Sequence, residues 1–267
     1  MDKSVKNRLR KLGIRPTKSL GQNFLDDGNI AKKIIGYANI NSSDKILEIG
    51  PGLGILTDFV VERAEKTILI EKDKKLTSYL EGRYSKYDLE IIQGDVLKIE
   101  LPEFDKVVSN LPFSISSPIT FKLLKCDFKI GILTYQQQFA ERMIAEVGEE
   151  EYSRLSVMVS VHAEVEKLFN ISKESFYPPP KVDATVIRLI PSEPEFVIKN
   201  EEIFSKVVKE LFNYRRKKIK NALKTGLDVN IDDVPYEDKR VGNISPEQIN
   251  EIVNHLIEEG TIDENNE

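Results

Sequence analysis

Residues 45–57 read KILEIGPGLGILT, an apolar run that passes directly into Gly50, Gly52 and Gly54. The run 45–49 is short and apolar on both faces, which indicates a strand buried on both sides of a sheet. Glycines let the backbone turn and pass close to a ligand, and the helix expected next, near 55–65, offers unpaired N–H groups at its start. The stretch therefore predicts a strand, a ligand-binding turn and a helix in succession.

The flanking sequence repeats this alternation of short apolar runs and helical spacing. Asp27 is a candidate N-cap for the first helix. Strands and helices that alternate in this way are typical of an α/β fold with a parallel, Rossmann-like sheet and helices on both faces. The pattern predicts strands at 45–49, 67–71, 89–93, 105–109 and 129–134, with helices near 55–65, 73–83 and 117–125.

The pattern changes after residue 137. Helical spacing near 137–146 and 153–161 precedes two strand-like runs, 163–170 and 182–190, which are joined by the stiff loop SKESFYPPP. The segment PSEPEF (191–196) reads as a linker, and helices are expected at 201–224 and 245–258. We therefore expect a domain over 1–190, with a basic N-terminal extension over 1–20, and a small helical domain over 191–267.

The composition excludes several classes of protein. No apolar run approaches the roughly 20 residues that cross a bilayer, and no secretory signal follows the basic N-terminus. The single cysteine, Cys126, cannot form an internal disulfide, and the two histidines form no metal-ligand pattern with it. We expect a cytoplasmic, monomeric protein with no membrane partner and no metal.

The net charge of −5 hides two basic stretches and an acidic end, with five acids in the last ten residues. The basic stretches suit a phosphate backbone, although solvated helix faces would look the same. If the first interpretation holds, both stretches contact nucleic acid. The first comprises Lys3, Lys6, Arg8, Arg10, Lys11, Arg15 and Lys18, and the second Arg215, Arg216, Lys217, Lys218, Lys220 and Lys224.

Carboxylates follow the glycine turn at the ends of the next two predicted strands. The glycine spacing is G-x-G-x-G rather than the G-x-G-x-x-G of dinucleotide sites, so a pyrophosphate is not the first choice of ligand. Glu71 is placed to accept hydrogen bonds from both hydroxyls of a ribose, and Asp95, followed by Val96, can reach an adenine amino group. This set favours an adenosine-containing ligand. Glu48 either binds the amino group of a methionine moiety or caps the turn.

The fourth predicted strand runs into Asn110-Leu111-Pro112-Phe113. The amino group of adenine is a poor nucleophile because its lone pair is delocalised into the ring. An Asn oxygen and the next backbone carbonyl can hold its two N–H groups and turn the lone pair toward an electrophile. Proline fixes the direction of that carbonyl, and Phe113 can stack on the base. In the alternative interpretation, Asn110 only bonds backbone and Phe113 packs in the core.

These motifs together resemble the ribosomal RNA adenine dimethyltransferase family, in particular its archaeal-type members that act on the small subunit. The resemblance runs in order from about residue 15 to 190, through GQNFLDD (21–27), LEIGPGLGILT (47–57), GDVL (94–97), NLPFSISSP (110–118), YQQQFAERM (135–143) and FYPPPKVDATVIRL (176–189). It implies a Rossmann-like methyltransferase fold that uses S-adenosylmethionine. The implied reaction is N6,N6-dimethylation of two adjacent adenosines in the 3′-terminal hairpin loop of small-subunit rRNA, within a pre-ribosomal particle.

The resemblance also implies roles for individual residues. The cofactor set is Asn23, Leu25, Gly50, Gly52, Glu71, Asp95, Val96 and Asn110, and the catalytic set is Asn110, Leu111, Pro112, Phe113 and Phe176. The target adenine would lie between Phe113 and Phe176. Phe113 stands where many members have Tyr, which keeps the stacking ring and removes a hydroxyl.

Two alternatives remain open. Relatives of the macrolide-resistance type methylate large-subunit rRNA, commonly with N-I-P-Y in place of N-L-P-F. The protein could also act mainly by binding, as a factor in ribosome assembly.

Overall fold

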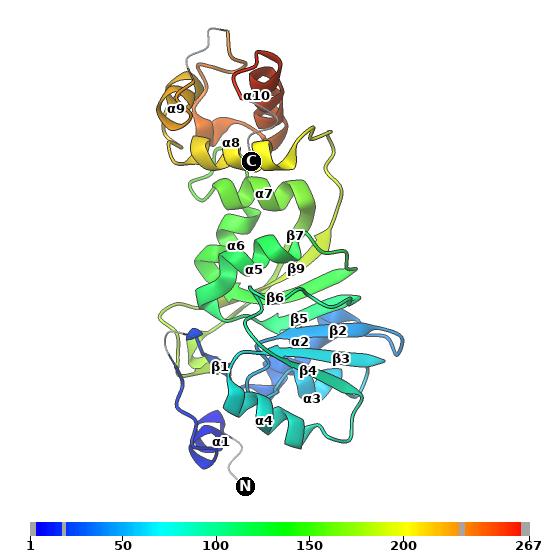
Figure 1. The fold of residues 1–267 in the computed structure, drawn as a ribbon. Coiled ribbons are helices and arrows are strands. Elements are labelled where there is room, and N and C mark those ends of the chain that lie inside the picture. Colours follow the sequence, from blue (N-terminus) through cyan, green and yellow to red (C-terminus); the bar gives the residue numbers. More distant parts are fainter. Residues whose placement is uncertain (1–3, 18–19, 230–232, 263–267) are drawn as a thin grey trace. The chain divides into compact units, whose positions relative to one another are not determined.

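The computed structural model describes residues 4–17, 20–229 and 233–262 (Figure 1). The chain divides into two compact units, the first formed by Met1–Ala140 with Val165–Pro191 and the second by Glu141–Glu164 with Ser192–Glu267. The sequence placed residues 1–190 in one domain, whereas the structure groups 141–164 with the C-terminal unit. The reason is that the helix inside this segment packs against the C-terminal helices.

The first unit is built on a seven-stranded sheet, as the alternating pattern predicted. The five strands at one side are parallel, and the next strand, β9, is antiparallel to β6. Leu47 of β2 lies between Ile68 of β3 and Val107 of β5. In order across the sheet the strands are β4 (Leu89–Gln93), β3 (Lys66–Glu71), β2 (Lys45–Ile49), β5 (Lys106–Asn110), β6 (Ile130–Gln136), β9 (Ala184–Pro191) and β7 (Ala163–Ile171).

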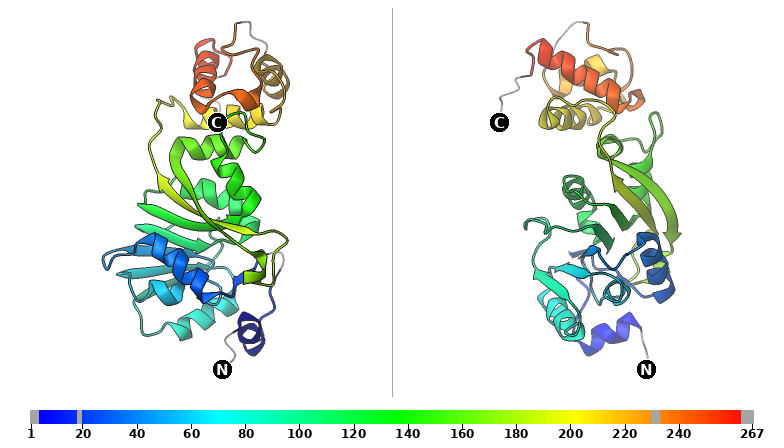
Figure 2. Two further views of the ribbon diagram at one scale, coloured as in Figure 1. Left: turned by 180° about the vertical axis from the view of Figure 1, so that it is seen from behind. Right: turned by 90° about the vertical axis from the view of Figure 1, so that its right-hand side faces the viewer.

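Helices cover both faces of this sheet. On one face, α2 (Gly28–Ala38) buries Ile34 among residues that include Ile132 of β6, and Figure 2 shows this helix lying across the sheet. Tyr135 points to the other face because successive strand residues alternate. There its hydroxyl lies 2.8 Å from that of Thr120 in α5 (Ser116–Leu123).

Two further helices follow β2 and β3 along the chain. They are α3 (Thr57–Val60) and α4 (Lys74–Arg83). The helix expected at 55–65 is thus only four residues long. Turns flank it on both sides, over 52–56 and 61–63, and within the first of them Gly54 adopts a φ of 78°.

Short elements at the N-terminus complete the first unit. They are α1 (Val5–Lys11) and β1 (Phe24–Leu25), the latter paired antiparallel with β8 (Phe176–Tyr177). This pairing places Leu25 opposite Phe176, although about 150 residues separate them.

The second unit is helical. Its elements are α7 (Arg154–His162), α8 (Glu201–Phe212), α9 (Ile219–Gly226) and α10 (Pro246–Glu258), while α6 (Gln137–Ile144) leads into it from the first unit. The single helix expected at 201–224 is broken between α8 and α9. Here the backbone bonds with 240–242 instead: Val241 N donates to Lys217 O and Gly242 N to Arg215 O, at 3.1 and 3.0 Å. Within the described ranges, no helix has the length and apolar character needed to traverse a bilayer.

Candidate active site

The glycine turn after β2 forms the floor of a pocket at the carboxyl ends of the parallel strands. Gly50 and Gly52 have φ values of 66° and 59°, a region that disfavours side chains. A Cβ on Gly52 would also come within 2.9 Å of the Phe24 ring, and one on Gly50 within 3.2 Å of Pro112. Glycine is therefore required here by both the backbone and the close packing.

Two buried carboxyl groups lie beside this turn. Glu71 accepts hydrogen bonds from the backbone N–H groups of Gly52 at 3.2 Å and Asp73 at 2.9 Å, and burial raises its pKa. Glu48 accepts the hydroxyl of Thr57 at 2.6 Å, and burial raises its pKa to about 8. Glu48 was expected either to bind the amino group of a methionine moiety or to cap the turn. Its contact with Thr57, the first residue of α3, corresponds to the second role.

Asp95 follows the next strand and lies half-buried beside a lysine. It accepts hydrogen bonds from Lys72 Nζ at 2.9 Å and from Leu97 N at 3.1 Å, and the bond from Lys72 lowers its pKa. The loop behind it is held by Lys122 of α5, whose ammonium donates to Val96 O at 2.8 Å and to Ile99 O. Asp95 is therefore ionised, and its loop is fixed by a cation that the sequence motifs did not reveal.

Asn110 is the last residue of β5, and only the nitrogen of its side-chain amide forms a hydrogen bond. Its Nδ2 donates to the carbonyl of Asn23 at 3.1 Å, whereas its Oδ1 is buried and has no hydrogen-bond partner. A buried acceptor without a partner is destabilising by about 1–3 kcal/mol. Because the bond to Asn23 fixes the amide, Oδ1 is oriented to receive an N–H group from a ligand.

The predicted site residues fall into two groups. Ten of the twelve line the pocket: Asn23, Leu25, Gly50, Gly52, Glu71, Asp95, Val96, Asn110, Leu111 and Pro112. The other two, Phe113 and Phe176, contact each other, with ring centroids 6.4 Å apart and planes at 64°. Phe176 is 3% exposed and packs in the core behind the sheet. The expected slot for a base between the two rings is closed in this structure, because β1 and β8 hold Phe176 inside.

The basic stretches are only partly available to a ligand. Lys3 and Lys18 lie outside the described residues. Arg8 points inward, where it donates to Leu53 O and to the Tyr79 hydroxyl. Arg215 donates to the carbonyls of Tyr152 and Glu149. Neither a free phosphate contact nor a solvated helix face therefore describes these two arginines, which instead bond the protein itself.

Ion pairs occupy part of the second stretch as well. Lys218 and Lys220 pair with Asp238 and Glu237, at 2.7 and 3.2 Å. The exposed basic side chains outside these two ion pairs are those of Lys6, Arg10, Lys11, Arg15, Arg216, Lys217 and Lys224.

Comparison with known proteins identifies this arrangement. The family model for ribosomal RNA adenine dimethylase matches residues 14–258, which include the strands, most of the pocket and most of the helical unit. The chain belongs to the ribosomal RNA adenine dimethylase family. It is therefore a methyltransferase that dimethylates adenine in rRNA, and the predicted α/β fold and enzyme class are confirmed.

Individual relatives of this adenine dimethylase support the assignment. A probable ribosomal RNA small subunit methyltransferase A from Thermococcus sibiricus is 44% identical, covering 98% of this chain and 100% of the relative. One of the same name from Methanosarcina acetivorans is 40% identical, with coverage of 95% and 98%.

Solved structures agree. A dimethyladenosine transferase from Plasmodium falciparum has a TM-score of 0.79 and 33% identity, covering 89% of this chain and 98% of that one. The 23S rRNA methyltransferase ErmE has a TM-score of 0.67 and 25% identity, with coverage of 88% and 100%.

Proposed function

We propose that this dimethylase uses S-adenosylmethionine to convert two adjacent adenosines in the 3′-terminal hairpin loop of small-subunit rRNA to N6,N6-dimethyladenosine, acting as a cytoplasmic monomer on a pre-ribosomal particle. The observation that carries the proposal is the unpaired, buried Oδ1 of Asn110 in the pocket. Support for the small subunit comes from the Thermococcus and Methanosarcina relatives, which match 98% and 95% of this chain and whose names specify that subunit.

The pocket residues fit the cofactor. The two glycines allow the backbone conformation of the turn that lines the pocket, Glu71 offers carboxylate oxygens to a ribose, and ionised Asp95 offers an acceptor to the adenine amino group. When bound, the cofactor supplies an electrophilic methyl group on a sulfonium. Because burial raises the pKa of Glu71, its carboxylate form, and with it cofactor affinity, should decline as pH falls through that pKa.

The target adenine is held by the motif that follows β5. Asn110 Oδ1 accepts one N–H of the amino group, and the Leu111 carbonyl accepts the other, which frees the nitrogen lone pair for the methyl group. Pro112, with φ −59° and ψ 119°, turns the chain into the 3-10 turn Phe113–Ile115. Phe113 is half-buried, so part of its ring is available to stack on the base, while Phe176 supports it edge-on from the core.

We assign RNA contact to the exposed cations of the two basic stretches. In the C-terminal unit these are Arg216, Lys217 and Lys224, which lie in or beside α9. Phosphate contacts of this kind strengthen binding without reading sequence. The acidic residues 263–267 lie outside the described part of the chain.

The test is methyl transfer from labelled S-adenosylmethionine to small and large ribosomal subunits that lack these methyl groups, with the modified nucleoside identified by mass spectrometry. Dimethyladenosine in the small-subunit 3′ hairpin is the expected result. Label confined to large-subunit RNA would instead assign the chain to the activity of the 23S enzyme ErmE, which it resembles less closely than the Plasmodium transferase.

A further inference from the structure

The N-terminal helix α1 packs on the outside of the glycine turn. Val5 and Leu9 are each 2% exposed and pack in one cluster with Leu53 of the turn and with Phe24. The backbone N–H of Val5 donates to Asp26 Oδ1 at 2.9 Å, which ties the start of the helix to the segment after β1. Two residues of α1, Val5 and Arg8, line the pocket itself. The helix is therefore part of the pocket wall.

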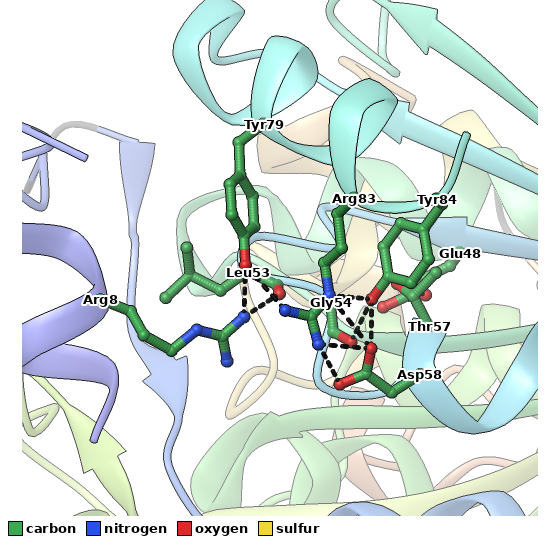
Figure 3. A network of polar contacts seen from close by, with 9 residues as sticks. All are labelled: Arg8, Glu48, Leu53, Gly54, Thr57, Asp58, Tyr79, Arg83 and Tyr84. Atoms are coloured by element: carbon green, nitrogen blue, oxygen red, sulfur yellow. Dashed lines mark hydrogen bonds and ion pairs between the residues drawn. The ribbon is translucent and has the colours of Figure 1, made fainter. Parts of the chain in front are cut away.

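Arg8 joins this helix to the turn by its side chain. One guanidinium nitrogen donates to the carbonyl of Leu53 at 2.8 Å and to the hydroxyl of Tyr79 at 2.7 Å, as Figure 3 shows. Hydrogen bonds from a charged donor are among the stronger ones in proteins. The other described cations of α1, namely Lys6, Arg10 and Lys11, are exposed. Arg8 thus differs from its neighbours in being directed at the turn.

The second carbonyl of the turn is held from α4. The hydroxyl of Tyr84, at the end of that helix, lies 2.8 Å from Gly54 O and 2.6 Å from Asp58 Oδ1, and its single proton is shared between these two acceptors. Asp58 also accepts from Arg83 through both carboxylate oxygens. Arg83 also donates to the Tyr79 hydroxyl at 2.9 Å, so that the network runs without a break from α1 to the turn (Figure 3). The backbone at Leu53 and Gly54 is therefore fixed by side chains of which only Arg8 also lines the pocket.

We propose that α1 is a cap on the cofactor pocket and that Arg8, through the Leu53 carbonyl, is the latch that holds it closed. This rests on the proposed use of S-adenosylmethionine. Forming one dimethyladenosine takes two methyl groups, so the cofactor is exchanged at least once per adenine. Because α1 forms part of the pocket wall, it must move away from the pocket while the cofactor is exchanged. Arg8 is a positioning residue in this scheme, and it retains the cofactor rather than binding RNA phosphate.

The experiment compares Arg8→Met with Arg10→Gln, a matched loss of one positive charge from the exposed side of the same helix. Affinity for S-adenosylmethionine is measured by calorimetry on the free enzyme, and opening of α1 by hydrogen exchange of its amides with and without S-adenosylhomocysteine. We expect Arg8→Met to weaken cofactor affinity by about tenfold, the loss of one charged hydrogen bond. Its α1 amides should exchange faster, and the cofactor should protect them less than in wild type. Arg10→Gln should match wild type in both measurements.

A second variant keeps the test decisive if Arg8→Met does not fold. Tyr79→Phe removes only the hydroxyl that accepts from Arg8 and Arg83, and it should weaken cofactor affinity by roughly threefold. Wild-type affinity and wild-type protection of α1 in a folded Arg8→Met or Tyr79→Phe protein would overturn the proposal. If wild-type protein binds no S-adenosylmethionine, the proposed function fails instead, and the two failures are therefore distinct.

Discussion

The proposed cofactor side of the pocket and its proposed target side differ in whether their polar groups already have hydrogen-bond partners. On the cofactor side, Glu71 and Asp95 already accept hydrogen bonds from the protein, and Lys122 holds the loop behind them. On the target side, Asn110 Oδ1 has no partner, and Phe113 rests against Phe176. Under the proposed roles, the protein alone orders the groups assigned to the cofactor, and the RNA base supplies the partner that Asn110 Oδ1 lacks. Substitutions on the two sides should therefore fail in different ways.

Phe176 gives the sharpest test of which aromatic ring belongs to the fold. Because its side chain is 3% exposed and packed in the core, Phe176→Ala should lower the free energy of unfolding by about 3–5 kcal/mol, measured by urea denaturation. Phe113→Ala, at a half-buried ring, should cost less stability than Phe176→Ala and slow methyl transfer by roughly ten- to a hundredfold through lost stacking. If Phe176→Ala keeps its stability and loses activity alone, Phe176 is an aromatic wall of the target site after all.

A substitution at Asn110 tests the proposed target side directly. Asn110→Ala removes the acceptor for the adenine amino group and should reduce the rate of methyl transfer by roughly 10²- to 10³-fold, measured in single-turnover assays. Cofactor affinity should change much less, because the Asn110 amide bonds the protein backbone rather than the glycine turn or the two carboxylates. Asn29→Ala, an exposed change on α2, is the control. Equal losses of rate and cofactor affinity would contradict the division between the two sides.

Lys122 tests whether the cofactor side depends on preorganisation. Lys122→Met removes the ammonium from the Val96 and Ile99 carbonyls and should weaken S-adenosylmethionine binding by about tenfold, with little change in kcat at saturating cofactor. The exposed Lys125→Met at the end of the same helix should bind as wild type does. A fall in kcat with unchanged affinity would place the role of Lys122 on the target side.

The smallest expected effect concerns the proton on Glu48. Burial raises its pKa to about 8, above the usual 4.5, so the folded protein keeps a proton that the unfolded chain releases. The stability from this group is therefore full below the unfolded pKa and is lost as pH rises toward 8. Wild type should lose on the order of 2 kcal/mol between about pH 6 and pH 7.5 relative to Glu48→Gln, measured by urea denaturation at each pH. Parallel pH curves for the two proteins would show that Glu48 is already ionised.

The sequence alone determined the parallel part of the sheet and the edge at which the pocket lies. Each strand from β2 to β6 is a short apolar run, and Asp27 caps α2 through the backbone N–H groups of Asn29 and Ile30, at 2.8 and 3.1 Å. These signals are local, because burial on both faces and capping depend on residues close together in the chain. Parallel strands then bring their carboxyl ends to one edge, which is why Glu71, Asp95 and Asn110 share a pocket.

Only the tertiary structure decided which distant groups meet. Local pattern gives no reason for Leu25 to lie opposite Phe176, for Arg8 to reach Leu53 rather than solvent, or for the chain near Arg215 to leave its helix and pair with Gly242. A basic residue on a helix has the same local signature whether it faces a phosphate or a carbonyl. Its partner is set by how the elements pack, because hydrogen bonds and burial between remote segments arise only when the core has formed.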